Sequence, residues 1–189
     1  MGLLEPFPPA ARVAVLGVGS ALRGDDGAGL GVARRLQAGR ARVRSGRLAA
    51  FIGHTAPENL TGEIARFRPT HLVLVDAADL GREPGAVELV PRERIAGASF
   101  STHALPLPLL IGYLERATGC RSIVVGIQPA QLGLMRRLSP EVQRAVGRVV
   151  ADIRGAIKAL RARPPAPRSR PGGGASPPGR RADLACAAR

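Results

Sequence analysis

The stretch His71-Leu72-Val73-Leu74-Val75 decides the fold, because it is the clearest buried strand in the chain and ends at an acid, Asp76. Four aliphatic residues in succession, two of them β-branched, are typical of a strand covered on both faces, as in a parallel sheet. An acid directly after such a run lies where the sheet meets solvent. The elements on either side of this strand then predict the architecture.

Short apolar runs alternate with segments of helical periodicity along the chain. Further strands are expected at residues 12–17, 48–52, 85–90 and 122–127. Helices are expected at residues 27–36, 57–67, 105–117 and 140–160, where apolar residues recur at helical spacing. This alternation predicts an α/β fold in which helices cover a mostly parallel sheet.

The composition is that of one domain with an aliphatic core. Of 189 residues, 45% are hydrophobic but only 3% are aromatic, so Val, Leu, Ile and Ala must fill the core. We expect a short extension over residues 1–11, an α/β domain over residues 12–160, and a disordered tail over residues 161–189, which is rich in Arg, Pro and Gly. The chain has no apolar run of about 18 residues and no secretory signal pattern, so we expect a cytoplasmic protein without a membrane partner.

The charge is strongly basic, at +14. Residues 161–189 hold seven arginines against one aspartate, and the remaining excess is spread over the rest of the chain. No aromatic residue lies among the tail arginines to stack on bases. The sequence therefore predicts weak adhesion to polyanions and no specific nucleic-acid partner. Cys120 and Cys186 have neither disulfide-framework nor metal-site spacing.

A glycine-rich loop, Gly17 to Gly27 (GVGSALRGDDG), follows the first expected strand. A dinucleotide fingerprint would require its third glycine at Leu22, where a side chain prevents close packing of helix on strand. Asp25 and Asp26 would also repel a pyrophosphate. Nucleotide binding is therefore disfavoured, although a small-molecule module built on this loop stays open as an alternative.

Three polar residues stand at the ends of expected strands or just before an expected helix: Asp26, Asp76 and His103. Each alone has a structural explanation, as a helix cap, a turn former or a packed side chain. Because ligands bind beyond the carboxyl ends of strands in such folds, the three are expected to converge there. Two carboxylates and an imidazole form an incomplete ligand shell for a divalent metal. Asp25 and Asp79 either tune this site electrostatically or act as surface or capping acids.

Several ordered motifs resemble those of the hydrogenase maturation proteases, especially the formate hydrogenlyase-type subgroup. They span roughly residues 12–150 and follow the family's order. They are Gly17-Val18-Gly19 through Gly29, Ala56-Pro57-Glu58-Asn59, Arg68-Pro69-Thr70, Val75-Asp76-Ala77, Pro84-Gly85, Ser101-Thr102-His103 and Gly126-Ile127-Gln128-Pro129.

The resemblance implies a three-layer fold with a twisted sheet, and an aspartic-type endopeptidase that trims the C-terminal peptide of a NiFe hydrogenase large-subunit precursor. It implies that Asp26, Asp76 and His103 form the catalytic, metal-contacting triad. The nickel is carried by the precursor and is not a stored cofactor. A monomer is expected, because the substrate must reach an open crevice. A non-catalytic protein that docks on the nickel-bearing partner is the alternative.

Two departures from the family pattern concern the loops. Ser20 stands where the family usually has Asn, and residues 131–137 are unusually basic. These differences bear on partner choice more than on the triad. Ser20 and Thr102 are expected to bond the backbone and not to act as nucleophiles.

Overall fold

The computed structural model describes residues 2–38, 46–95 and 106–162. A five-stranded sheet in the order β2-β1-β3-β5-β4 forms its centre. All neighbouring strands run parallel except β4, which pairs antiparallel with β5. The strands are β1 (Val13–Val18), β2 (Leu48–His54), β3 (His71–Ala77), β4 (Val87–Leu89) and β5 (Arg121–Ile127).

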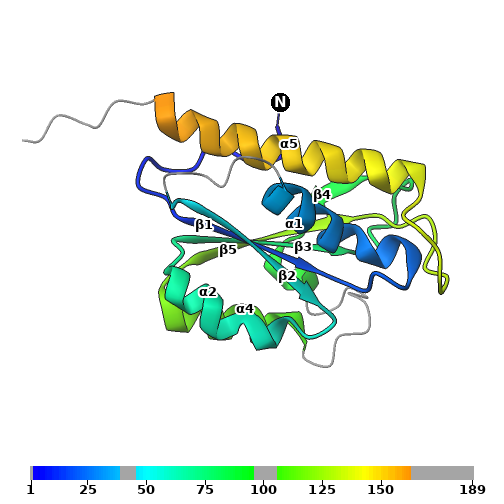
Figure 1. The fold of residues 1–189 in the computed structure, drawn as a ribbon, viewed down its shortest axis with the longest axis horizontal. Coiled ribbons are helices and arrows are strands. Elements are labelled where there is room, and N and C mark those ends of the chain that lie inside the picture. The colour runs from blue at the N-terminus through cyan, green and yellow to red at the C-terminus, as the bar shows by residue number, and fades with distance from the viewer. Residues whose placement is uncertain (1, 39–45, 96–105, 163–189) are drawn as a thin grey trace, which may run out of the picture.

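Helices cover both faces of the sheet, as Figure 1 shows, with α1 and α5 on one side and α2 and α4 on the other. The helices are η1 (Gly24–Gly27), α1 (Ala28–Ala38), η2 (Pro57–Leu60), α2 (Thr61–Phe67), α3 (Arg92–Ile95), α4 (Leu107–Thr118) and α5 (Pro140–Ala162). The expected three-layer α/β fold with a mostly parallel sheet is therefore confirmed.

The central strands are buried on both faces because successive side chains enter two different cores. In β3, Val73 and Val75 join the core beneath α1 and α5, whereas Leu72 and Leu74 join the core beneath α2 and α4. The N-terminal segment contributes to the first core, where Leu4 and Phe7 are buried.

Three expected boundaries differ from the structure for local reasons. The strand expected at 85–90 is only β4, because Gly85 adopts φ 79° before it and Pro91 follows it. The helix expected at 57–67 divides into η2 and α2. The helix expected from residue 27 begins with the 3-10 turn η1, which carries Asp25 and Asp26.

Helix α1 lies unusually close to the sheet at two glycines. A Cβ at Gly29 would lie 2.1 Å from the Val75 carbonyl oxygen and 2.5 Å from that of Val18. A Cβ at Gly17 would lie 2.1 Å from the carbonyl oxygen of Gly29. The absence of side chains at Gly17 and Gly29 thus fixes the distance between α1 and strands β1 and β3.

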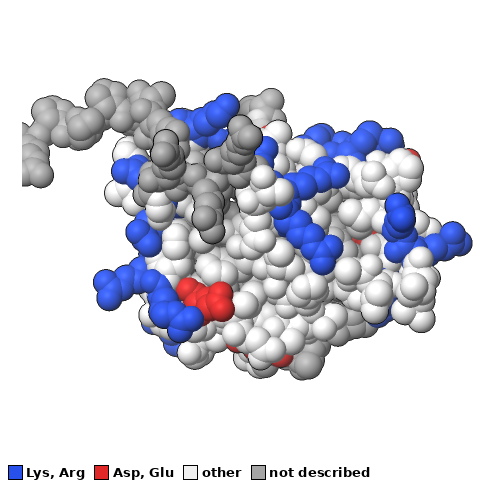
Figure 2. Space-filling view, viewed as in Figure 1, with Lys and Arg blue, Asp and Glu red and all other residues white. Residues whose placement is uncertain are grey.

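Basic side chains are scattered over the face seen in Figure 2 and do not form a single stripe. Within the described part of the chain, no helix combines the length and apolarity needed to cross a membrane.

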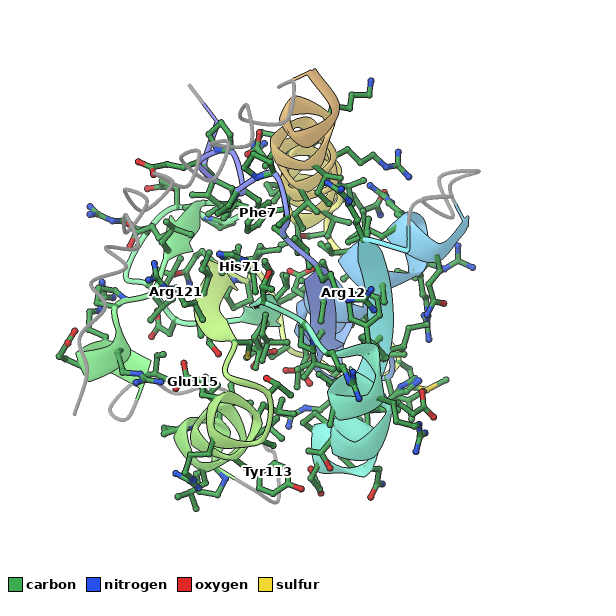
Figure 3. All side chains as sticks on the ribbon, turned by 90° about the vertical axis from the view of Figure 1, so that its left-hand side faces the viewer. Phe7, Arg12, His71, Tyr113, Glu115 and Arg121 are labelled. Atoms are coloured by element: carbon green, nitrogen blue, oxygen red, sulfur yellow. The ribbon has the colours of Figure 1, made fainter. Side chains whose placement is uncertain are left out.

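The amino edge of the sheet carries the partly buried His71, seen in Figure 3 between Phe7 and Arg121. The Phe7 and His71 rings meet edge-on with centroids 5.2 Å apart. Thr70 Oγ1 lies 2.9 Å from His71 Nδ1. Burial, and secondly the charge of Arg121, lowers the pKa of His71 below its ordinary value of 6.5.

This lowered pKa predicts a small loss of stability in mild acid. Below pH 6.5 and down to the lowered pKa, the unfolded chain binds more protons at His71 than the folded chain does. The free energy of unfolding should therefore fall as pH drops through this window, and the His71 contribution should be complete above it. Urea unfolding at about pH 5.5 and about pH 7.5 measures the slope, which His71→Gln should reduce. An unaltered slope in the variant would contradict the assignment.

Candidate functional site

The carboxyl edge of the sheet brings together two of the three expected site residues, Asp26 and Asp76. Asp26 lies in η1, which follows β1. Asp76 is the last residue but one of β3 and is paired in register with Gly126 of β5. Both side chains are fully buried. Strands β1 and β3 are neighbours in the sheet, so the two acids reach the same edge.

The two carboxylate oxygens of Asp26 differ in their hydrogen bonding within the described residues. Its Oδ2 accepts a hydrogen bond of 2.9 Å from the Ser20 backbone N–H. Its Oδ1 is buried and has no hydrogen-bond partner among the residues that the structure describes. Because buried polar atoms are nearly always paired, such an oxygen is unfavourable in the free chain. A ligand cation or a donor from a substrate would satisfy it.

Gly19 lies beside both acids. It adopts φ 124°, a conformation that side chains rarely permit. A Cβ at this position would lie 1.8 Å from the Asp26 carbonyl oxygen and 3.6 Å from Asp76 Oδ1. The same Asp76 Oδ1 accepts a 2.8 Å bond from the Ala77 backbone N–H. Only glycine therefore fits at this position, where the Asp26 backbone packs against Gly19 close to the Asp76 carboxylate.

His103, the third expected residue, lies outside the described residues, and so do Ser101 and Thr102. Across residues 2–38, 46–95 and 106–162, no three His, Cys, Asp or Glu side chains converge to hold a metal ion. The described part of the site is a pair of carboxylates.

Asp25 has a structural role that the sequence did not indicate. It is fully buried, so it is not a surface acid. Its Oδ2 accepts bonds from the Ala130 and Gln131 N–H groups, at 2.9 and 3.0 Å, and its Oδ1 accepts a 2.6 Å bond from the Ser139 N–H. Asp25 thus fixes the segment between β5 and α5 against η1.

Asp79 is an exposed turn former. Its Oδ1 accepts a bond from the Gly81 N–H and a longer one from Gln128 Nε2. Gln128 Oε1 in turn accepts from the Leu80 and Arg82 N–H groups, at 2.7 and 3.3 Å. Asp79 is therefore a surface acid, which was one of the two expectations for it.

Glu58 is a further acid near the same edge that the residue-by-residue reasoning did not assign. It lies in η2, which follows β2, and its Oε2 is buried without a hydrogen-bond partner in the described residues. In the sequence, Glu58 could have been found from its position after an expected strand. Ser20 behaves as expected of a backbone-bonding residue, since its Oγ accepts from the Leu22 N–H at 3.3 Å.

Two buried carboxylates at one edge of the sheet can contact a borderline divalent cation or accept a proton from a bound water. Both roles require oxygen atoms directed at one point. The buried Asp26 Oδ1, which has no hydrogen-bond partner among the described residues, is available for either role.

Comparison with known proteins agrees with this fold. The family model for hydrogenase maturation proteases matches residues 34–156. The hydrogenase 3 maturation protease of Escherichia coli K12 is 34% identical over 142 residues, which is 75% of this chain and 88% of that protein.

Solved structures show the same likeness. A crystal structure of the NiFe hydrogenase maturation protease HycI from Thermococcus kodakarensis KOD1 is similar with a TM-score of 0.70 and 31% identity. It matches 78% of this chain and 93% of that one. The solution structure of the endopeptidase HycI from Escherichia coli gives a TM-score of 0.67 and 33% identity, over 76% and 89% of the two chains.

Proposed function

The chain belongs to the hydrogenase maturation protease family, and from this premise we propose that it removes the C-terminal peptide from a nickel-loaded large-subunit precursor of a NiFe hydrogenase. One observation links this function to a particular residue. The buried Asp26 Oδ1 has no hydrogen-bond partner in the described part of the chain. Such an oxygen is suited to a cation that arrives with the substrate.

Asp26, Asp76 and His103 are the proposed contacts to the nickel carried by the precursor. Nickel is then part of the substrate, and the free enzyme has no need to store it. Two carboxylates and one imidazole leave coordination positions for the ligands that the precursor already supplies. A precursor without nickel would lack the group that these side chains bind.

The chemical contribution of the chain begins with positioning. Contact between nickel and the carboxylates would hold the scissile peptide against the edge of the sheet, which converts recognition into orientation. Asp26 or Asp76 could then accept the proton of the attacking water. Activation of the water by the precursor's nickel is the other route.

The test is the intact mass of a large-subunit precursor, from the organism that encodes this chain, before and after incubation with the protein. We expect a single C-terminal peptide to be lost from the nickel-loaded precursor and nothing to be lost from the nickel-free one. Binding without any mass change would contradict the proposal and favour a docking protein. Equal cleavage of both precursors would contradict the recognition of nickel.

A further inference from the structure

A cluster of exposed apolar side chains lies beside the carboxylate pair. It consists of Leu22, Leu132, Leu134 and Met135, which are 60%, 44%, 74% and 81% exposed, and we refer to it as the apolar rim. The described residues include three other exposed large hydrophobic side chains, Leu89, Leu109 and Tyr113, which lie elsewhere on β4 and α4. The apolar rim gathers on two loops at the carboxyl edge of the sheet, on the right in Figure 1.

The two loops of the apolar rim are joined to each other by their backbones. The Met135 N–H donates a 2.7 Å bond to the Leu22 carbonyl oxygen, and Arg23 and Arg136 form a parallel bridge. Met135 adopts φ 56°, which turns the second loop at this point. The apolar side chains are therefore carried on a defined frame, and ordering them on binding costs little.

The same frame is connected to the candidate site through Asp25. Its carboxylate binds the N–H groups at both ends of the second loop, and its own N–H donates a 3.0 Å bond to the Gln131 carbonyl oxygen. The next residue is Asp26. The apolar rim is thus continuous with the carboxylate pair, and a chain that reaches Asp26 would pass over or beside it.

The charged side chains of the two loops that carry the apolar rim are all basic. Arg23, Arg136 and Arg137 flank the apolar side chains, and residues 20–24 and 129–138 contain no Asp or Glu. Apolar side chains bordered by arginine are typical of protein interfaces. They are complementary to a partner segment that alternates apolar and acidic side chains.

We propose that the apolar rim docks the C-terminal region of the large-subunit precursor, beside the scissile peptide, through an apolar segment that carries acidic side chains. This inference rests on the proposed function, because it takes the substrate to be a protein. Side chains exposed to this degree add nothing to the stability of the free chain, whereas burial against a partner would stabilise the complex. The acids then bind the nickel, and the apolar rim binds the chain that surrounds it.

The test combines three substitutions in the apolar rim: Leu22→Ser, Leu134→Ser and Met135→Asn. Asparagine is chosen at position 135 because it tolerates positive φ. The matched control replaces two exposed apolar residues of α4, Leu109→Ser with Tyr113→Ser. Steady-state cleavage of the nickel-loaded precursor gives kcat and KM for each protein, and thermal melting verifies that each is folded.

For the apolar rim variant we expect KM to rise about 10-fold or more with little change in kcat, because docking energy is lost equally from the ground state and the transition state. The control variant should match the wild type. Wild-type KM should also rise with salt, since the flanking arginines attract an acidic segment.

Three results would overturn the docking proposal. They are an unchanged KM in a folded apolar rim variant, an equal rise of KM in the α4 control, or a sedimentation coefficient of the free apolar rim variant that differs from that of the free wild type. The last would identify a second copy of this chain as the occupant. Failure of the wild type to cleave any nickel-loaded precursor would instead contradict the proposed function, so the two failures are distinguishable.

Discussion

Asp26→Asn should slow precursor cleavage by at least about 100-fold, equivalent to about 2.7 kcal/mol of lost transition-state stabilisation. The amide oxygen of asparagine can still accept the bond from the Ser20 N–H that Asp26 Oδ2 now accepts. The variant loses the negative charge of the unpaired Oδ1, which is the atom proposed to contact nickel. Single-turnover cleavage of the nickel-loaded precursor measures the rate of the chemical step.

Stability separates a functional role of Asp26 from a structural one. A buried carboxylate oxygen without a partner is unfavourable, so its replacement should leave the melting temperature unchanged or raise it slightly. Asp152→Asn is the matched control. Asp152 lies on α5, far from Asp26 in sequence, and its partly buried carboxylate accepts a hydrogen bond from the Leu3 N–H. A destabilised Asp26→Asn protein that cleaves at the normal rate would show that Asp26 is only structural.

Asp25→Ala should lower the free energy of unfolding by about 3–5 kcal/mol. The substitution removes one buried carboxylate and leaves the Ala130, Gln131 and Ser139 N–H groups without their acceptor. Hydrogen bonds to a charged group are each worth about 1.5–3 kcal/mol, and they do not add fully. Against a typical total of 5–15 kcal/mol, a loss of this size is severe. Urea denaturation with a two-state fit measures it.

The control for Asp25 is Asp79→Ala, because Asp79 is an exposed acid with only two weaker partners. Its loss should cost no more than about 1 kcal/mol. Precursor cleavage by Asp25→Ala should also weaken, since the loop that carries the apolar rim would lose its attachment to η1. Equal stability of the two variants would contradict the structural role given to Asp25.

The sheet could be predicted from sequence because β1, β3 and β5 are covered on both faces, so their apolar runs are continuous. The position of Asp76 followed from its place directly after a buried run, and that of Asp26 from the loop that follows the first strand, since both lead to the carboxyl edge. The structure brings both residues to that edge, where both lie next to Gly19. His103 lies outside the described residues and stays a prediction.

The role of Asp25 could not be predicted because its partners are backbone amides more than 100 residues away. Backbone N–H groups are present at every position, so no sequence pattern marks the ones that Asp25 binds. The apolar rim was missed for a related reason. Leu22, Leu134 and Met135 have no periodicity, and they are brought together by the hydrogen bond and the bridge between their loops.

The near-contact of α1 with the sheet at Gly17 and Gly29 restricts how the enzyme can respond to its substrate. With Gly29 of α1 packed closely against the carbonyl oxygens of Val18 and Val75, the helix has no room to move toward the sheet. A rearrangement that pressed α1 into the sheet is therefore excluded. Asp26 and Asp76 should therefore keep the same separation before and after the precursor arrives, and the conformational adjustment on encounter falls on the precursor's C-terminal chain.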